Sequence, residues 1–282
     1  MSNTSPFHRK PSARVSRALK LGRAAVLSVA LGLPVALAST HAAAEPVKPD
    51  QAVRNVVLVH GAFVDASIWN EVITILAADG YNVAAVQLPL TSLADDVHAT
   101  REVLSHMNGP TLLAGYSWGG EPVSEVGVDP KVRGMVYFAA ITPDVGQSLR
   151  DLLKSYPAMP GSAAIYDGEN GMLWMKPELF AFALAHDSSR ARTNVMSVAQ
   201  KPTSKRVFDD APTQAAWKTK PSWYVVASED KIIPVDLQRK LAAKIGATKF
   251  ELPTGHAIIL SQPEASARII EQAAQSLSAK SN

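Results

Sequence analysis

Short apolar runs alternate with stretches of helical spacing through most of this chain, and few folds accept that alternation. Residues 55–59 are almost continuously apolar, as expected for a strand that is covered on both faces. Residues 67–79 then carry apolar side chains at helical intervals, and Gly80 follows where glycine commonly ends a helix. The same patterns predict strands at 81–86, 111–114, 132–140, 223–227 and 249–252, and helices at 92–107, 120–126, 235–245 and 263–276. The alternation therefore predicts an α/β fold with a mostly parallel, doubly wound sheet.

One long segment interrupts this alternation. Residues 145–220 contain helical patches at 149–156 and 177–185 but no convincing strand, and residues 166–168 have the composition of a turn. An insertion of this length between two strands is typical of a lid over the open edge of a sheet. We expect a helical lid at 145–220, inserted before the strand at 223–227; extra scaffold without a binding role is the alternative.

Residues 1–44 have the composition of an export signal. Basic residues from Arg9 to Arg23 precede the apolar run 24–38, and three alanines at 42–44 form a small-residue cleavage site. The apolar run contains Pro34 and is shorter than the ~20 residues that span a bilayer, although an uncleaved anchor is an alternative. We expect a secretory signal peptide at 1–44 and a mature domain at 45–282. That domain would be periplasmic or extracellular, without stable membrane insertion after cleavage.

The composition excludes several chemistries. The 282-residue chain has no cysteine, so disulfides, thiolate catalysis and cysteine-ligated metals are excluded. The net charge of +3 comes from the six basic residues of 1–44, because residues 45–282 hold 22 basic and 25 acidic side chains. That part has no basic run and no glycine-rich nucleotide loop, so we expect no nucleic-acid partner. We also expect no metal and no cofactor, and no feature indicates an oligomeric state.

A glycine-rich segment carries the main indication of chemistry. Residues 115–120 read GYSWGG and lie between a predicted strand and a predicted helix. In that context a Gly-x-Ser-x-Gly pattern places the serine on a sharp turn, with its hydroxyl raised above the sheet. The first N–H groups of the helix then lie beside the hydroxyl, where negative charge would develop. Ser117 is therefore the predicted nucleophile.

The segment HGAF at 60–63 follows the first strand of the mature domain and faces the same edge. Acyl transfer passes through an oxyanion that preorganised N–H donors stabilise. We expect those donors to be the N–H groups of Ala62 and of Trp118, the residue after the nucleophile. We expect His60 to support the loop through hydrogen bonds and to take no part in proton transfer.

A base and an acid are expected on loops at the same edge of the sheet. His256 follows the last predicted strand, and the carboxyl ends of parallel strands gather on the edge that carries Ser117. Asp230 follows the strand at 223–227 and would orient His256, which gives the chain order serine, aspartate, histidine. Glu229 and Asp144 are the rival acids. Other histidines are assigned to the surface of the helix at 92–107 (His98 and His106) and to the lid (His186).

Aromatic and methionine side chains near these positions predict an apolar substrate pocket. Phe63 and Trp69 are the candidate substrate-binding residues, together with apolar side chains of the lid. The alternative for each is plain packing of the lid onto the sheet. Candidates from the lid are Met159, Met172, Trp174, Met175, Phe180 and Phe182.

Four segments resemble the α/β-hydrolase superfamily: VLVHGAFVDASIW, GYSWGGEPVSE, SWYVVASEDKIIP and GHAIILSQPE. They are most similar to bacterial exported hydrolases of this fold, and more distantly to the plant methylesterase and hydroxynitrile lyase branch. The resemblance implies the α/β-hydrolase fold over residues 54–282 and the same nucleophile, acid, base and oxyanion donors.

The sequence also departs from those relatives. Tyr116 stands where relatives often have histidine, and Trp118 where they often have tyrosine or methionine, and both changes narrow the expected pocket. The lyases place a lysine near the catalytic histidine, whereas Gly255 and Ala257 flank His256 here. Dehalogenases and epoxide hydrolases of this fold use an aspartate nucleophile, which Ser117 disfavours.

The expected reaction is hydrolysis of a small carboxylic ester through an acyl-enzyme on Ser117. Two alternatives stay open at this point. One is cofactor-free perhydrolysis of the haloperoxidase type, in which peroxide replaces water at the acyl-enzyme. The other is a non-catalytic binding protein of the same fold.

Overall fold

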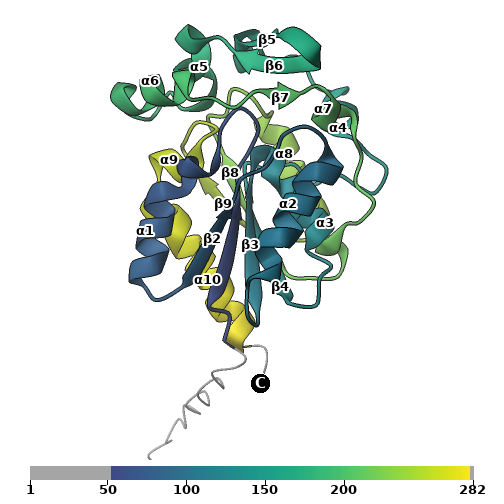
Figure 1. Cartoon of the computed structure of the whole chain (residues 1–282), viewed down its shortest axis with the longest axis vertical. Helices are drawn as coiled ribbons and strands as arrows, with labels where there is room; N and C mark the ends of the chain where they lie inside the picture. The colour runs from purple at the N-terminus through teal and green to yellow at the C-terminus, as the bar shows by residue number, and fades with distance from the viewer. Residues whose placement is uncertain (1–51, 280–282) are drawn as a thin grey trace, which may run out of the picture. The chain divides into compact units, whose positions relative to one another are not determined.

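A six-stranded parallel sheet forms the centre of the computed structural model, which describes residues 52–279 (Figure 1). The predicted export signal at 1–44 and the predicted start of the mature domain lie outside these residues and stay predictions. The strand order is β2-β1-β3-β4-β8-β9, which confirms the predicted α/β fold with a mostly parallel sheet. The strands are β1 (Asn55–Val59), β2 (Asn82–Val86), β3 (Thr111–Tyr116), β4 (Val132–Phe138), β8 (Ser222–Ala227) and β9 (Thr248–Leu252).

Helices cover both faces of the sheet. On one face lie α1 (Asn70–Ala78) and α10 (Pro263–Ala279); on the other lie α2 (Leu93–Ser105), α3 (Gly120–Val126) and α8 (Val235–Lys244) (Figure 1). Successive side chains of a strand point to opposite faces, so β1 supplies both cores. Val56 and Leu58 pack with α1 and α10, whereas Val57 and Val59 pack with α2 and α3. All four are fully buried, which explains the unbroken apolar run.

The order of the strands reverses at β1. The chain runs outward from β1 to β2 and then returns to β3 on the other side of β1. In open α/β sheets, ligands bind at such a switch point, beyond the carboxyl ends of the strands. The loop after β1 and the turn after β3 are therefore neighbours at the edge where chemistry is expected.

The lid contains both helices and a small sheet. Its helices are α4 (Leu149–Leu153), α5 (Pro177–Leu184), α6 (Arg190–Val198) and α7 (Arg206–Asp209). An antiparallel sheet joins β5 (Ile165–Asp167), β6 (Met172–Met175) and β7 (Thr203–Ser204). These elements lie beyond the carboxyl ends of the parallel strands (Figure 1).

The prediction that residues 145–220 contain no strand was wrong at β5, β6 and β7. Tyr166 and Asp167 lie in β5 and pair with Trp174 and Leu173, whereas the reversal itself falls at Asn170 and its neighbours. Strand β5 has only three residues, and all four residues of β6 are apolar, so neither sequence shows the alternation of apolar and polar residues that marks a half-buried strand. The pairing between them is what defines them as strands.

The remaining elements are short. Helix α9 (Ile258–Ser261) precedes α10, and 3-10 turns occur at Ala66–Trp69, Ser117–Gly119, Pro160–Ala164, Glu169–Gly171 and Ala216–Lys218. Within residues 52–279, no helix has both the length and the apolar character needed to cross a membrane.

Candidate active site

Ser117 lies on the turn between β3 and α3. Its φ of 55° falls in the left-handed region, which is strained for a residue with a Cβ and is common at functional sites. Glycine is required around it, because a Cβ on Gly119 would lie 2.5 Å from the carbonyl oxygen of His60. A Cβ on Gly115 would lie 2.7 Å from the carbonyl oxygen of Gly119. The glycines therefore let the turn close tightly and hold Ser117 at the edge of the sheet.

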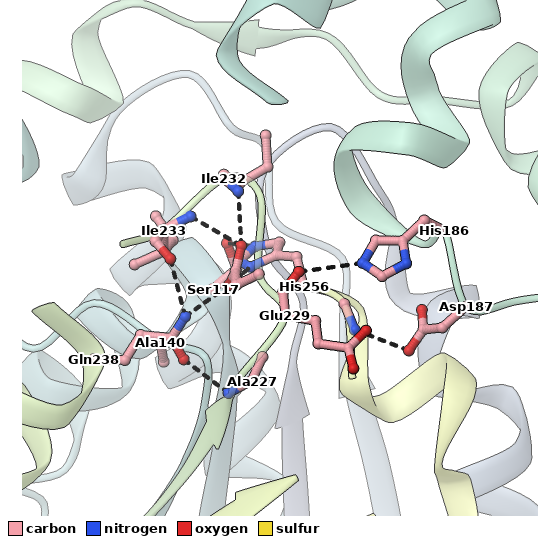
Figure 2. Close-up of polar contacts among 12 residues, drawn as sticks. Ser117, Ala140, His186, Asp187, Ala227, Glu229, Ile232, Ile233, Gln238 and His256 are labelled. Atoms are coloured by element: carbon pink, nitrogen blue, oxygen red, sulfur yellow. Dashed lines mark hydrogen bonds and ion pairs between the residues drawn. The ribbon is translucent and has the colours of Figure 1, made fainter. Parts of the chain in front are cut away.

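His256 lies in hydrogen-bond contact with Ser117. It follows β9, and its Nε2 is 2.8 Å from Ser117 Oγ (Figure 2). Its Nδ1 is 2.6 Å from Asp230 Oδ2, on the loop after β8. Because the carboxylate accepts, Nδ1 carries the proton and Nε2 is free to accept from the Ser117 hydroxyl. The structure thus brings the predicted nucleophile, base and acid together, with 8% or less of each residue exposed.

The Asp230 carboxylate has three further donors. Its Oδ1 accepts the N–H groups of Ile232 and Ile233 at 2.7 and 2.9 Å. Its Oδ2 accepts Nε2 of Gln238, on α8, at 2.7 Å. Gln238 is itself fully buried, and its Oε1 accepts the N–H of Ala227 at 3.0 Å (Figure 2). The carboxylate is therefore fixed from the backbone and from a neighbouring helix.

Gln238 was missed in the sequence, although one signal was present. It is a polar residue directly after Leu237, on the side of the helix that packs against the sheet. The rival acids lie elsewhere in the structure. Asp144 pairs with Lys218 and Lys244 at 3.1 and 3.4 Å, and Glu229 contacts the lid through its carbonyl oxygen.

The loop after β1 packs against the nucleophile. A Cβ on Gly61 would lie 2.7 Å from Ser117 Cβ and 3.2 Å from its Oγ, so the loop backbone touches the serine. Among the residues that the structure describes, none accepts a hydrogen bond from the N–H of Ala62. Both Ala62 and Trp118 line the cavity that contains Ser117. The N–H groups of Ala62 and Trp118 therefore remain the predicted oxyanion donors.

His60 supports that loop. Its Nε2 accepts the N–H of Leu88 at 3.0 Å, so Nδ1 carries the proton and donates to the carbonyl of Gly61 at 2.8 Å. The side chain is fully buried, and this burial lowers the pKa of His60 to about 4. His60 is therefore neutral at physiological pH and ties the loop after β1 to the loop after β2.

The side chain of Trp118 is anchored by a buried carboxylate that sequence reasoning missed. Its indole Nε1 donates to Asp96 Oδ2 at 2.7 Å, and Asp96 Oδ1 accepts the N–H of Leu90 at 2.8 Å. Burial raises the pKa of Asp96 to about 6, although these two hydrogen bonds act in the opposite direction. From the sequence, Asp96 is merely an acidic residue in the first turn of a helix, where acids are common.

A cavity of about 290 Å³ opens onto Ser117 and His256. Phe63 lines it, together with Ala62 and Trp118. The lid supplies an apolar wall of Leu149, Leu153, Ile165, Leu173, Leu184 and Phe208. None of the six methionine and aromatic residues of the lid that the sequence suggested lies in this lining. A larger hollow, of about 430 Å³, lies between α1, α6 and α9 and contains none of the triad side chains.

Trp69 does not lie in the cavity, which corrects its assignment to substrate binding. The turn at Ala66–Trp69 directs the indole into the core, where it is fully buried. Its ring meets the ring of Phe138 edge-on, with 5.7 Å between centroids. Trp69 is therefore a packing residue under α1.

His98, on α2, and His106, the residue that follows its last turn, are exposed, as expected, and His186 lies in the lid close to the loop of Asp230. No group of three or more histidine, aspartate or glutamate side chains within 52–279 is arranged to hold a metal ion.

Known proteins resemble this chain in sequence and in fold. The chain is 25% identical over 241 residues to an alpha-hydroxynitrile lyase of Arabidopsis thaliana, covering 74% of this chain and 92% of that protein. It is 25% identical over 242 residues to polyneuridine aldehyde esterase of Rauvolfia serpentina, covering 74% and 91%. A crystal structure of a pyrethroid hydrolase from Sphingobium faniae superposes with a TM-score of 0.69 at 21% identity, covering 79% of this chain and 98% of that one, and shows the same fold. Residues 56–269 match the alpha/beta hydrolase family, and the chain therefore belongs to that family.

Proposed function

We propose that this protein is a serine hydrolase that cleaves a small carboxylic ester through an acyl-enzyme. The observation that carries the proposal is the continuous hydrogen-bond chain from Ser117 through His256 to Asp230, which opens onto an apolar cavity. The likeness to polyneuridine aldehyde esterase supports ester hydrolysis as the reaction class.

In the first half of the reaction, Ser117 Oγ attacks the ester carbonyl carbon while His256 Nε2 takes the hydroxyl proton. The carbonyl oxygen becomes an oxyanion, which accepts hydrogen bonds from the N–H groups of Ala62 and Trp118. The imidazolium that forms on His256 is stabilised by Asp230, 2.6 Å from Nδ1. His256 then donates its proton to the alcohol oxygen as the ester bond breaks, leaving the acyl group on Ser117.

In the second half, water replaces the alcohol. His256 Nε2 accepts a proton from the water as its oxygen attacks the acyl carbon, and the same two N–H groups hold the new oxyanion. The proton returns to Ser117 Oγ as the acid product leaves. Each step uses the geometry already present between Ser117 and His256.

The cavity favours a small, uncharged ester. Its volume is close to the lower end of the ~300–1,000 Å³ that is usual for ligand sites. Arg150, which also lines it, forms an ion pair with Asp209 and so presents no free charge to a substrate. No lysine occurs among the described lining residues, so a lyase reaction that needs one beside His256 gains no support.

The test is hydrolysis of p-nitrophenyl esters of increasing acyl length by the purified protein and its Ser117→Ala variant. We expect kcat to fall by about 10³-fold or more in the variant, since its nucleophile is gone. The dependence on acyl length would measure how much of the cavity the acyl group fills. Labelling by a fluorophosphonate should occur in the wild type and be lost in the variant.

Equal ester hydrolysis by both proteins would contradict the serine mechanism. Absence of both hydrolysis and labelling in the wild type would favour a binding role for the same fold. Adding hydrogen peroxide and a halide to the wild-type assay separates hydrolysis from perhydrolysis, because only the latter yields a halogenated product.

A further inference from the structure

Residues 184–187, at the end of helix α5 in the lid, touch both loops that carry the acid and the base. We call this segment the clasp. Leu184 and Ala185 are buried, His186 is half-buried and Asp187 is exposed. Figure 2 shows His186 reaching from the lid toward Glu229, and Asp187 reaching toward the backbone N–H of Gly255 on the neighbouring loop. None of the four residues bonds to Ser117, His256 or Asp230 directly.

The clasp grips the base loop on both sides of His256. Asp187 Oδ2 accepts the N–H of Gly255 at 2.9 Å, and the carbonyl oxygen of Leu184 accepts the N–H of Ala257 at 2.8 Å. The backbone is therefore held one residue before and one residue after the base.

The clasp also reaches the acid loop. His186 Nε2 lies 3.2 Å from the carbonyl oxygen of Glu229, which can only accept, so Nε2 donates. Glu229 precedes Asp230, and its own N–H donates to the carbonyl of Thr254 in the base loop at 3.0 Å. The acid loop, the base loop and the clasp therefore form a closed ring of backbone and side-chain hydrogen bonds.

The clasp side chains also lie close to the Cα of Gly255. A Cβ there would lie 3.0 Å from both Asp187 Oδ1 and His186 Nε2. The backbone of Gly255 is not in the left-handed region, so a larger residue there would meet only the clasp side chains, which would have to shift.

We propose that the clasp sets the positions of His256 and Asp230, with Asp187 as a positioning residue. The inference rests on the proposed hydrolase function and adds a role for the lid beyond covering the cavity. Small displacements of a base from its nucleophile lower kcat strongly, because proton transfer depends on their alignment. Leu184 also lines the cavity, so the lid wall that a substrate touches continues directly into the contacts that hold the base.

The test uses three variants of the full chain. Asp187→Ala removes the acceptor for Gly255. Asp187→Asn removes the charge but keeps a side-chain oxygen that can accept the same N–H. Asp167→Ala is the matched control, since Asp167 is an exposed lid carboxylate that pairs with Lys205 at 2.9 Å and does not line the cavity.

We expect kcat for p-nitrophenyl butyrate to fall by about tenfold in Asp187→Ala, with KM changed by less than about twofold. Asp187→Asn should recover kcat to within about twofold of the wild type, and Asp167→Ala should match the wild type. In proton NMR spectra, the low-field resonance of His256 Nδ1–H should shift or broaden in Asp187→Ala. It should be unchanged in Asp187→Asn and Asp167→Ala. That resonance reports the contact between His256 and Asp230 without any substrate.

A purely structural role for Asp187 predicts a lower melting temperature or a higher KM with kcat and the resonance unchanged, and that result would overturn the proposal. An Asp187→Asn variant as impaired as Asp187→Ala would also overturn it, because charge would then outweigh the hydrogen bond. If the wild type hydrolyses no ester, the proposed function fails, but comparison of the resonances still decides whether the clasp positions His256.

Discussion

A buried histidine and a buried aspartate lie on each side of Ser117. On one side the two are hydrogen-bonded to each other, and on the other side they are not. On one side, the loops after β8 and β9 supply Asp230 and His256, which bond to each other at 2.6 Å. On the other side, a histidine and an aspartate are equally buried, but each has its own partners. His60 bonds to two backbone groups, and Asp96 bonds to an indole and a backbone N–H.

This contrast shows that partners decide what a buried histidine can do. His256 faces a carboxylate, so a proton gained at Nε2 would be stabilised when Ser117 reacts. His60 faces a carbonyl and an N–H, so a second proton would have no acceptor and would displace the bond from Leu88. One histidine is suited to carry a proton briefly, and the other to remain neutral and hold a loop.

The largest expected difference between the two histidines is the loss of kcat when each is replaced. His256→Gln should lower kcat by about 10³-fold or more, because glutamine cannot accept and return the proton. His60→Gln should lower kcat by less than about tenfold, since an amide can accept from Leu88 and donate to Gly61. Steady-state kinetics on one ester measures both. A loss in His60→Gln as large as in His256→Gln would mean that the two sides share the proton transfer.

The second expected effect is a dependence of the unfolding free energy on pH, to which His60 and Asp96 contribute. The pKa of His60 is about 4 in the folded protein against 6.5 when unfolded, so the unfolded chain binds the proton first as pH falls. Stability from His60 is therefore present above pH 6.5 and is lost toward pH 4, by about 3 kcal/mol. The pKa of Asp96 is about 6 in the folded protein against 3.8 when unfolded, so the folded protein binds this proton first as pH falls. Protonation of Asp96 therefore adds about 3 kcal/mol to the unfolding free energy as pH falls from 7 toward 4.

The two contributions oppose each other in the wild type, and single variants should separate them. Between pH 7 and pH 4, the unfolding free energy of His60→Gln relative to the wild type should rise by about 3 kcal/mol. That of Asp96→Asn should fall by about the same amount. Urea unfolding at both pH values measures the differences. If the unfolding free energies of both variants change with pH by the same amount as that of the wild type, neither group titrates as its burial indicates.

The smallest expected effects are those of replacing Trp69, which packs in the core, and Phe63, which lines the cavity. Trp69→Phe should cost about 1 kcal/mol of stability, because part of the lost packing is offset by removal of a buried indole N–H. In the described part of the chain that N–H has no acceptor. KM should not change, whereas Phe63→Leu, in the cavity wall, should alter KM. A severalfold rise in KM for Trp69→Phe would restore Trp69 to the binding site.

The sheet was predictable from the sequence for a physical reason that does not extend to the lid. Strands β1 and β3 are buried on both faces, so nearly every residue must be apolar and the run itself marks the strand. In the lid, β5 and β6 are short and half-exposed, and they are strands only because Tyr166 and Trp174 pair across a turn. Such pairing depends on two segments at once and leaves little local trace.

The same division applies to the site. Ser117 and His256 could be found because each follows a strand whose end reaches one edge of the sheet. The positions of Gln238, Asp96 and Asp187 could not, since each depends on which side chain of another element faces it. The apolar wall was misassigned for a related reason, because periodicity does not say which lid residues turn inward.

The tight turn at Ser117 has a consequence for engineering of this enzyme. A Cβ on Gly120 would lie 2.5 Å from the carbonyl oxygen of Ile141, so residue 120 is as restricted as Gly115 and Gly119. A saturation library across this segment would be spent largely on chains that cannot close the turn. Variation is better directed to Leu149 and Leu153 in the lid wall, where the cavity can be reshaped while the backbone around Ser117 stays unchanged.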